Sequence, residues 1–122
     1  MDGDWEKIEA IEGLEIERGL RIIAGDRALY KKLLHLFYEQ LLAFDQKFPE
    51  ALASGDRDAQ RFLAHSLKGA CANLGAMEMY EKMQVLDASC KQEAERPVLE
   101  AQFAEVQSCM KLMLTQLADL FS

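Results

Sequence analysis

Hydrophobic residues recur at spacings of three and four along most of this chain, which is the period of one face of an α-helix. The clearest run lies in residues 97–120, where the steps alternate between four and three: Leu99, Phe103, Val106, Met110, Met113, Leu117 and Leu120. A second run lies in residues 27–48: Tyr30, Leu33, Phe37, Leu41, Phe44 and Phe48. No segment has the strict alternation of a β-strand. The pattern therefore predicts an all-α protein.

The first helices are bounded by glycine, aspartate and proline. Residues 1–14 combine helical spacing with two glycines, so both a helix and a loosely ordered N-terminal extension stay open. Residues 15–25 are predicted to form a short helix that ends in a glycine. Asp26 then caps the N-terminus of helix 27–48. Pro49 is predicted to end that helix, because proline lacks a backbone N–H and disfavours a helical residue before it.

Two more helices lie between Pro49 and the last one. Residues 49–55 are predicted as a connection that could contain a helical turn at Glu50–Ala53. Asp56 is predicted as the N-cap of helix 57–74, which a glycine ends. The apolar stripe of this helix falls within about 40° on a helical wheel. Its members are Leu63, Leu67, Ala70 and Leu74. The next helix starts at about Met77, with the stripe Met79, Met83, Leu86 and Cys90.

Four amphipathic helices joined by short links can bury their stripes by packing side by side, each antiparallel to the last. We predict an antiparallel four-helix bundle, with the short helix of residues 15–25 packed across one end. The chain of 122 residues is long enough for one hydrophobic core, so residues 1–122 are predicted to form a single domain. Because the long helices can cover one another's apolar faces, we expect a monomer.

Charge and cysteines narrow the function further. The net charge of −7, from 21 acidic and 14 basic residues, disfavours binding to nucleic acid. No apolar run approaches the ~20 residues of a membrane span, and the charged N-terminus does not resemble a signal peptide. The three cysteines lack CxxC spacing and are expected to be reduced, buried thiols in a cytoplasmic protein.

One of the two histidines combines exposure with suitable neighbours. His65 lies about 190° from the centre of its helix's stripe, and Lys68 and Gly69 follow on the same outer face. Ala64 and Ala72 are expected to keep the surroundings of the ring low. Neutral imidazole is a nucleophile near pH 7, and Lys68 could offset the charge of a phosphoryl group on it. Gly69 costs a helix about 1 kcal/mol relative to alanine, which suggests that space beside the ring is needed.

The other histidine is a comparison within the same chain. His35 lies about 150° from the stripe of its own helix, but its neighbours at i+3 and i+4 are Tyr38 and Glu39. A large ring and a negative charge do not suit a phosphoryl group. We interpret His35 as a structural or surface residue. It could pack with Tyr38 and Leu42 against the first helix, or this apolar material could equally belong to a docking face.

The segment around His65 resembles the signature of histidine-containing phosphotransfer (HPt) domains: His65-Ser66-Leu67-Lys68-Gly69, followed by Asn73-Leu74-Gly75-Ala76. Three segments of the first two helices are also similar to the family: Gly19-Leu20, Gly25-Asp26-Arg27-Ala28-Leu29-Tyr30 and Leu33-Leu34-His35-Leu36-Phe37. The resemblance covers roughly residues 11–95. The last helix matches in pattern more than in residues.

The resemblance implies a phosphoryl carrier rather than an enzyme. His65 would accept a phosphoryl group on Nε2 from the aspartyl phosphate of a receiver domain and pass it to a response regulator. The receiver would supply magnesium, and the chain itself would need no metal or cofactor. In the family a residue on the next helix holds the other ring nitrogen. Asp87 corresponds to it here, with Gln84 one turn earlier as the alternative. Arg61 and Ala72 would lie on the receiver-docking face.

Two other functions stay open at this point. The same motif occurs in the N-terminal domain of chemotaxis-type kinases, where a separate ATP-binding domain phosphorylates the histidine; here that domain would act in trans. The chain could also be a non-catalytic helical adaptor in which His65 is incidental. The dimeric helices of histidine kinases fit less well, because their histidine is typically followed by an acidic residue rather than by a serine such as Ser66.

Overall fold

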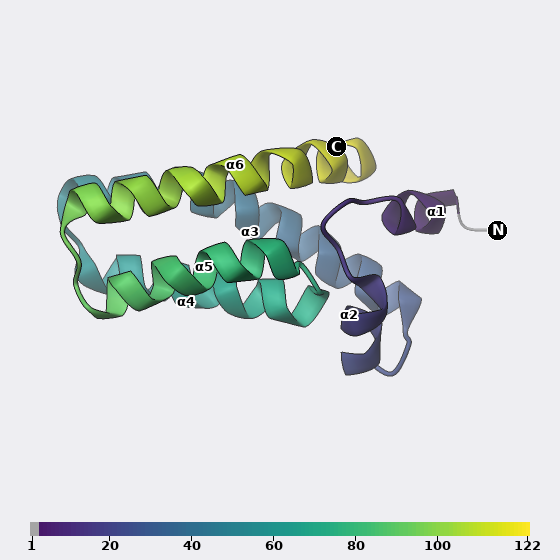
Figure 1. The fold of residues 1–122 in the computed structure, drawn as a ribbon. Helices are drawn as coiled ribbons and strands as arrows, with labels where there is room; N and C mark the ends of the chain where they lie inside the picture. The colour runs from purple at the N-terminus through teal and green to yellow at the C-terminus, as the bar shows by residue number, and fades with distance from the viewer. Residues whose placement is uncertain (1–2) are drawn as a thin grey trace.

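The computed structural model describes residues 3–122, and every regular element in that range is a helix (Figure 1). The six helices are α1 (Gly3–Glu9), α2 (Ile16–Ile22), α3 (Arg27–Ser54), α4 (Arg57–Leu74), α5 (Met77–Lys91) and α6 (Arg96–Phe121). The all-α class predicted from the sequence is therefore confirmed. None of the helices in the described part has both the length and the apolar character that crossing a membrane requires.

The helices α3 to α6 lie side by side, and each runs opposite to the one before it (Figure 1). α4 packs on both α3 and α5, and α6 packs on both α5 and α3. The two short helices lie at the end where the described chain starts and finishes, α1 against α6 and α2 against α3 and α4. The sequence predicted one short helix at that end, and the structure has two.

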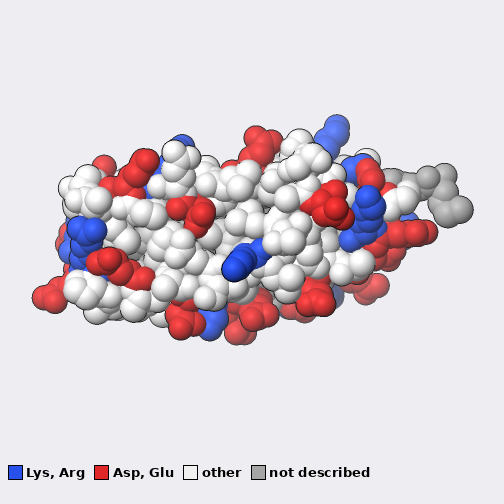
Figure 2. All heavy atoms as spheres, turned by 90° about the horizontal axis from the view of Figure 1, so that it is seen from above, with Lys and Arg blue, Asp and Glu red and all other residues white. Residues whose placement is uncertain are grey.

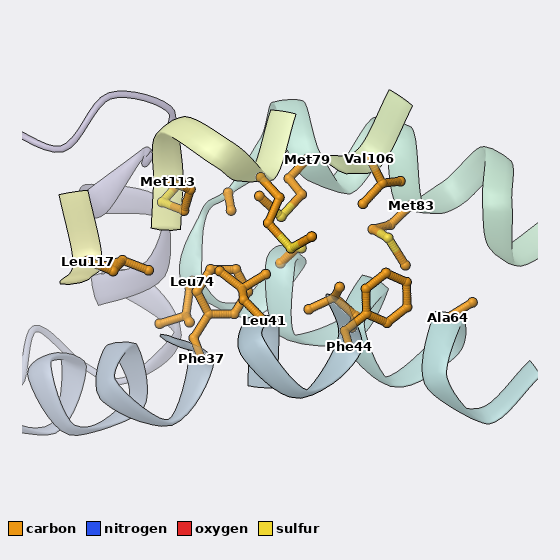
Figure 3. Packing of buried hydrophobic residues seen from close by; sticks show 14 of the residues in the cluster. Phe37, Leu41, Phe44, Ala64, Leu74, Met79, Met83, Val106, Met113 and Leu117 are labelled. Atoms are coloured by element: carbon orange, nitrogen blue, oxygen red, sulfur yellow. The ribbon is translucent and has the colours of Figure 1, made fainter. Parts of the chain in front are cut away.

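The hydrophobic core lies between the long helices α3 to α6. Figure 3 shows labelled side chains of α3 pointing towards methionines of α5 and Val106 of α6. The stripes predicted for α5 and α6 are buried, apart from a half-buried Leu120. In α3, Leu34 is buried where the sequence predicted Leu33.

The buried stripe of α4 is rotated from the predicted one. Ala64 and Cys71 are fully buried, whereas Leu63 and Ala70 lie half-buried at the edge of the core. The prediction that Ala64 lies beside the ring of His65 and keeps its surroundings low is therefore wrong. A hydrophobic pattern gives small side chains little weight, so it did not show that Ala64 and Cys71 face the core.

The predicted break at Pro49 is also wrong. α3 continues through Pro49 to Ser54 and ends at Gly55, whose φ of 68° places it in the left-handed region. Proline removes one helical hydrogen bond, but the extra turns bury Ala51 and Leu52. The carbonyl of Ala51 also accepts a 3.0 Å hydrogen bond from the buried amide of Gln60. These contacts with the rest of the chain outweigh the local preference of proline.

The N-terminal segment, left open as a loosely ordered extension, contains helix α1 and packs on the core; residues 1–2 lie outside the described part. Trp5 is buried with its ring edge-on to Tyr30, at 6.0 Å between centroids. The guanidinium of Arg27 lies 4.9 Å from the centre of the indole ring. Ile8 and Ile11 are also buried. This burial compensates for the weak helix propensity of the glycines.

α2 approaches α3 and α4 through a glycine. Gly19 is buried, and a Cβ added there would lie 2.6 Å from Tyr30 Cε2 and 2.8 Å from the carbonyl oxygen of Leu74. That carbonyl accepts a 2.7 Å hydrogen bond from the Tyr30 hydroxyl. The end of α4 is also bound to the residue before α2, because the backbone N–H of Glu15 donates to the carbonyl of Gly75 at 2.8 Å.

The surface carries charges of both signs. Figure 2, turned by 90° about the horizontal axis from the view of Figure 1, shows acidic and basic side chains scattered over this face with uncharged areas between them. No continuous basic patch lies on the face that this view displays. The acidic excess of the sequence therefore appears there as scattered charges, not as one strongly charged surface.

Candidate functional site

The N-cap, the C-terminal glycine and the buried face of α4 together fix the helix so that His65 faces solvent. Asp56 caps the helix, since its Oδ1 accepts a 3.0 Å hydrogen bond from the backbone N–H of Ala59. Gly75 ends it in the left-handed region at φ 85°. The opposite face of α4 is fixed in the core. The side chain of His65 therefore points outward and is 64% exposed.

The carboxylate of Asp87 lies next to the imidazole. Asp87 comes from α5, and only 2% of its surface is exposed. Its Oδ1 lies 3.6 Å from Nδ1 of His65. This oxygen is buried and has no hydrogen-bond partner among the described residues. A buried acceptor without a partner is unusual, and the N–H of His65 Nδ1 is the donor that could reach it after a small movement of the exposed ring.

Two lysines hold the other oxygen of Asp87. Lys68 Nζ donates to Oδ2 at 2.8 Å, and Lys91 Nζ lies 3.1 Å from the same atom. Burial acts to raise the pKa of Asp87, but the hydrogen bonds and positive charges of the two lysines outweigh it, so the pKa is lowered. The hydrogen bond to Asp87 in turn raises the pKa of Lys68. At neutral pH the carboxylate of Asp87 is therefore ionised and Lys68 is charged.

The result is a site with an excess of positive charge. The ammonium groups of Lys68 and Lys91 face one carboxylate beside the exposed imidazole of His65. One positive charge is left over next to an exposed nucleophile. Such a site can stabilise a negatively charged group that becomes attached to the ring.

The outer surface beside the ring is open. A Cβ added to Gly69 would meet nothing within 4 Å. Phe62, one turn before His65, is 70% exposed and offers a large apolar ring to solvent. A second macromolecule can therefore approach the imidazole over Gly69 and meet an apolar contact at Phe62.

In comparison with known proteins, a family model described as the Hpt domain matches residues 32–120. The chain belongs to the Hpt domain family. Hpt domains perform histidine phosphotransfer in two-component signalling and are phosphoryl carriers rather than enzymes. Neither curated proteins nor solved structures gave a match. The match includes nearly all of α6, which resembled the family in pattern more than in residues. It leaves α1, α2 and the start of α3 outside.

Within this Hpt domain, the residues singled out from the sequence fall into two groups. Lys68 and Asp87 lie together with His65, and Lys68 is bound to Asp87, not to the ring. Gln84 is exposed and makes no hydrogen bond to His65 within residues 3–122. Arg61 forms ion pairs with Asp58 and Glu93. Its charge is therefore partly compensated.

The remaining positions have plainer surroundings. Ala72 is half-buried. His35 stacks on Phe121 of α6, at 4.6 Å between ring centroids, and its Nε2 lies 3.5 Å from Glu39. The prediction that His35 packs against the first helix is therefore wrong, because α6 covers this face of α3.

Cys71 and Cys90 are buried as predicted, and burial raises the pKa of Cys71 to about 12. Cys109 is half-buried.

Sequence reasoning missed Lys91. It lies four residues after Asp87 on α5, so the two side chains share a helix face. That spacing was the available signal, but it becomes meaningful only when Asp87 is known to be buried, because an exposed pair of this kind contributes little.

We expect the stability contributed by Asp87 to depend on pH. Asp87→Asn should lower the free energy of unfolding at pH 7 by about 1–2 kcal/mol, since it removes charged hydrogen bonds from two partly exposed lysines. The pKa of Asp87 is lower in the folded state, so its contribution is present above the ordinary value of about 3.9 and is lost as the pH falls through the folded value. Urea unfolding of both proteins from pH 7 to pH 3 measures this.

The matched control is Glu81→Gln, which removes an exposed carboxylate from the same helix. Its effect at pH 7 should stay within about 0.5 kcal/mol. A difference between wild type and Asp87→Asn that is constant across the pH range would contradict the prediction.

Proposed function

We propose that this Hpt domain carries a phosphoryl group on Nε2 of His65. The group would come from the aspartyl phosphate of one receiver domain and be passed to a second receiver in a two-component phosphorelay. The observation that supports this best is the carboxylate of Asp87, buried 3.6 Å from Nδ1 of the exposed imidazole and held by two lysines. The family match supports the type of chemistry.

The arrangement suits nucleophilic attack by Nε2. A proton on Nδ1 faces Oδ1 of Asp87, which leaves the lone pair on Nε2 directed away from the carboxylate. In the transfer, Nε2 forms a bond to phosphorus while the bond from phosphorus to the aspartyl oxygen breaks, and the receiver's carboxylate leaves. The ring becomes positively charged, and Asp87 stabilises this charge. Transfer to the next receiver is the reverse reaction with a different carboxylate.

The chain's contribution is position and charge. Phosphoryl transfer needs the reacting atoms in line and the charge of the moving group compensated. We propose that the receiver supplies magnesium from its own acidic site, while α4 supplies a nucleophile on a rigid helix. Lys68 serves as the partner for the phosphoryl charge, and Gly69 keeps the approach open.

We propose that α3 to α6 form the four-helix bundle of this family as one domain with the short N-terminal helices at its end, and that the protein works as a monomer in the cytoplasm. The receiver would dock over the outer face of α4. Phe62 and Gly69 are the most open positions on it. Arg61 and Ala72, suggested by the sequence, would lie at the edge of this contact.

A panel of phosphorylated receiver domains tests the proposal. After incubation with a cognate receiver, the chain should carry an acid-labile phosphate that mass spectrometry places on His65. A histidine kinase domain with ATP forms a parallel arm, because direct labelling by it would favour the chemotaxis-kinase arrangement. Failure of every cognate receiver, or label on another residue, would overturn the assignment.

We expect Gly69→Glu to slow transfer without unfolding the protein. A Cβ at this position meets open space, so the fold should tolerate the change. The added carboxylate would stand beside the ring and repel the incoming phosphoryl group. The rate constant of transfer from a receiver should fall at least about tenfold, which equals about 1.4 kcal/mol in the barrier. Gly69→Ala adds a methyl group without a charge, so it separates the effect of bulk from that of charge and should slow transfer less than Gly69→Glu. Equal rates for wild type and a folded Gly69→Glu protein would contradict the prediction.

A further inference from the structure

Two lysines share one oxygen atom of Asp87. Lys68 Nζ lies 2.8 Å from Oδ2 and Lys91 Nζ lies 3.1 Å from the same atom, while Oδ1 has no hydrogen-bond partner among the described residues. One ammonium group would be enough to neutralise one carboxylate. The second positive charge is surplus as long as His65 is unmodified.

The two lysines differ in how they are attached to the site. Lys68 belongs to α4 and follows His65 by three residues, so it stands on the helix that would carry the phosphoryl group. Lys91 belongs to α5 and follows Asp87 by four residues, so it stands on the helix of the carboxylate. The side chain of Lys68 is 21% exposed and that of Lys91 is 52% exposed. Both lysines contact Asp87, but only Lys68 stands on the same helix as the imidazole.

Phosphorylation changes the balance of charge. A phosphoryl group brings close to two negative charges and oxygens that are strong acceptors. Lys68 would then have two anions to choose between. The charged ring lies beside Oδ1, so Lys68 can leave only if another cation stays on Oδ2, because removing the only partner of a buried charged oxygen is strongly unfavourable. Lys91 already occupies that place.

We propose that Asp87 releases Lys68 to the phosphoryl group when His65 is phosphorylated, while Lys91 stays on Oδ2 and keeps the carboxylate ionised and in position. This inference rests on the proposed function, in that His65 is the phosphoacceptor. Lys91 is then a positioning residue that acts through Lys68 and Asp87. Oδ1 stays available to the N–H of Nδ1 throughout.

Phosphoramidate, a small phosphodonor, tests the exchange without a receiver. The lone pair of Nε2 forms the new bond to phosphorus, and the nitrogen–phosphorus bond of phosphoramidate breaks. The nitrogen of phosphoramidate is protonated in its zwitterionic form, so it leaves as neutral ammonia with the electron pair of that bond, and the proton on Nδ1 of His65 stays in place. The measured quantity is the ratio of phosphorylated to unmodified His65 at the plateau, from phosphorus NMR and mass spectrometry of the intact protein.

Lys91→Met should lower this ratio about tenfold, the effect of losing one charge-assisted hydrogen bond to the phosphoryl group. Lys91→Arg should restore it, since arginine can also hold the carboxylate. Lys82→Met removes a lysine from the same helix, one that pairs with Glu105 at 3.4 Å, and should leave the ratio unchanged. Thermal unfolding of each variant checks that it is folded.

A double-mutant cycle shows whether Lys91 acts by releasing Lys68 from Asp87 or whether the two lysines stabilise the phosphoryl group independently. If Lys91 acts by releasing Lys68, Lys91→Met should have no further effect in a Lys68→Met background, whereas independent charges would give additive effects. Additive effects, or a wild-type ratio in folded Lys91→Met, would overturn the exchange alone. Absence of label on His65 of the wild type would overturn the exchange and the phosphoacceptor together. Failure of receivers to transfer, with the phosphoramidate results as expected, would overturn only the proposed partner.

Discussion

Replacing His65 by glutamine should abolish phosphoryl acceptance and leave the fold unchanged. The glutamine amide nitrogen shares its lone pair with the carbonyl group and is not a nucleophile, so no bond to phosphorus forms. The side chain is 64% exposed and makes no hydrogen bond within the described residues, so the free energy of unfolding should change by less than about 0.5 kcal/mol. Incubation with a phosphorylated receiver, followed by measurement of the label on the chain, gives the result directly.

His35→Gln is the matched control. It removes the other histidine, which is also exposed on a helix but stacks on Phe121. Label should reach this variant at the wild-type level, although the variant loses some stability with the stacked ring. Residual label on His65→Gln, or loss of label from a folded His35→Gln protein, would contradict the assignment of the acceptor.

Gly19→Ala should destabilise the protein by about 3 kcal/mol, although alanine favours a helix. The new methyl group would lie 2.6 Å from Tyr30 and 2.8 Å from the carbonyl of Leu74. Relief of these contacts requires α2 to move away or the buried hydrogen bond from the Tyr30 hydroxyl to Leu74 to break. Overpacking and the loss of a buried hydrogen bond each cost about 1–3 kcal/mol. Urea unfolding gives the difference in free energy.

Gly69→Ala makes the same chemical change at a helical glycine with open space around it. There only the helix propensity acts, so this variant should be more stable than wild type by about 0.5–1 kcal/mol. The two substitutions therefore have opposite expected signs. Stabilisation by Gly19→Ala would show that α2 does not pack closely through this residue in solution.

Local signals in the sequence were enough to locate α4 and the start of α5. Asp56 and Gly75 bound α4 at the predicted residues, because an N-cap and a left-handed glycine act through their own backbone neighbours. The same local reasoning failed at Pro49. There the outcome depends on the burial of Ala51 and Leu52 against the rest of the chain, which no local pattern reports.

At the candidate site, too, the sequence predicted what depends on one helix and missed what depends on contacts between helices. The exposure of His65 and the space at Gly69 follow from the periodicity of one helix, and the sequence predicted both. Contacts between α4 and α5 depend on how the two helices are set against each other. The sequence could therefore name Asp87 from the family resemblance, but it could not show that Lys68 binds this carboxylate or that Lys91 joins it.

The position of the only tryptophan has a practical consequence for spectroscopy. Trp5 lies in α1, buried against Tyr30 and covered by the guanidinium of Arg27. Intrinsic fluorescence therefore reports how α1 is docked on the neighbouring helices. A change in emission during heating that precedes the loss of helical circular dichroism would mark the detachment of α1 from an otherwise folded domain, with α4 and its histidine still in place.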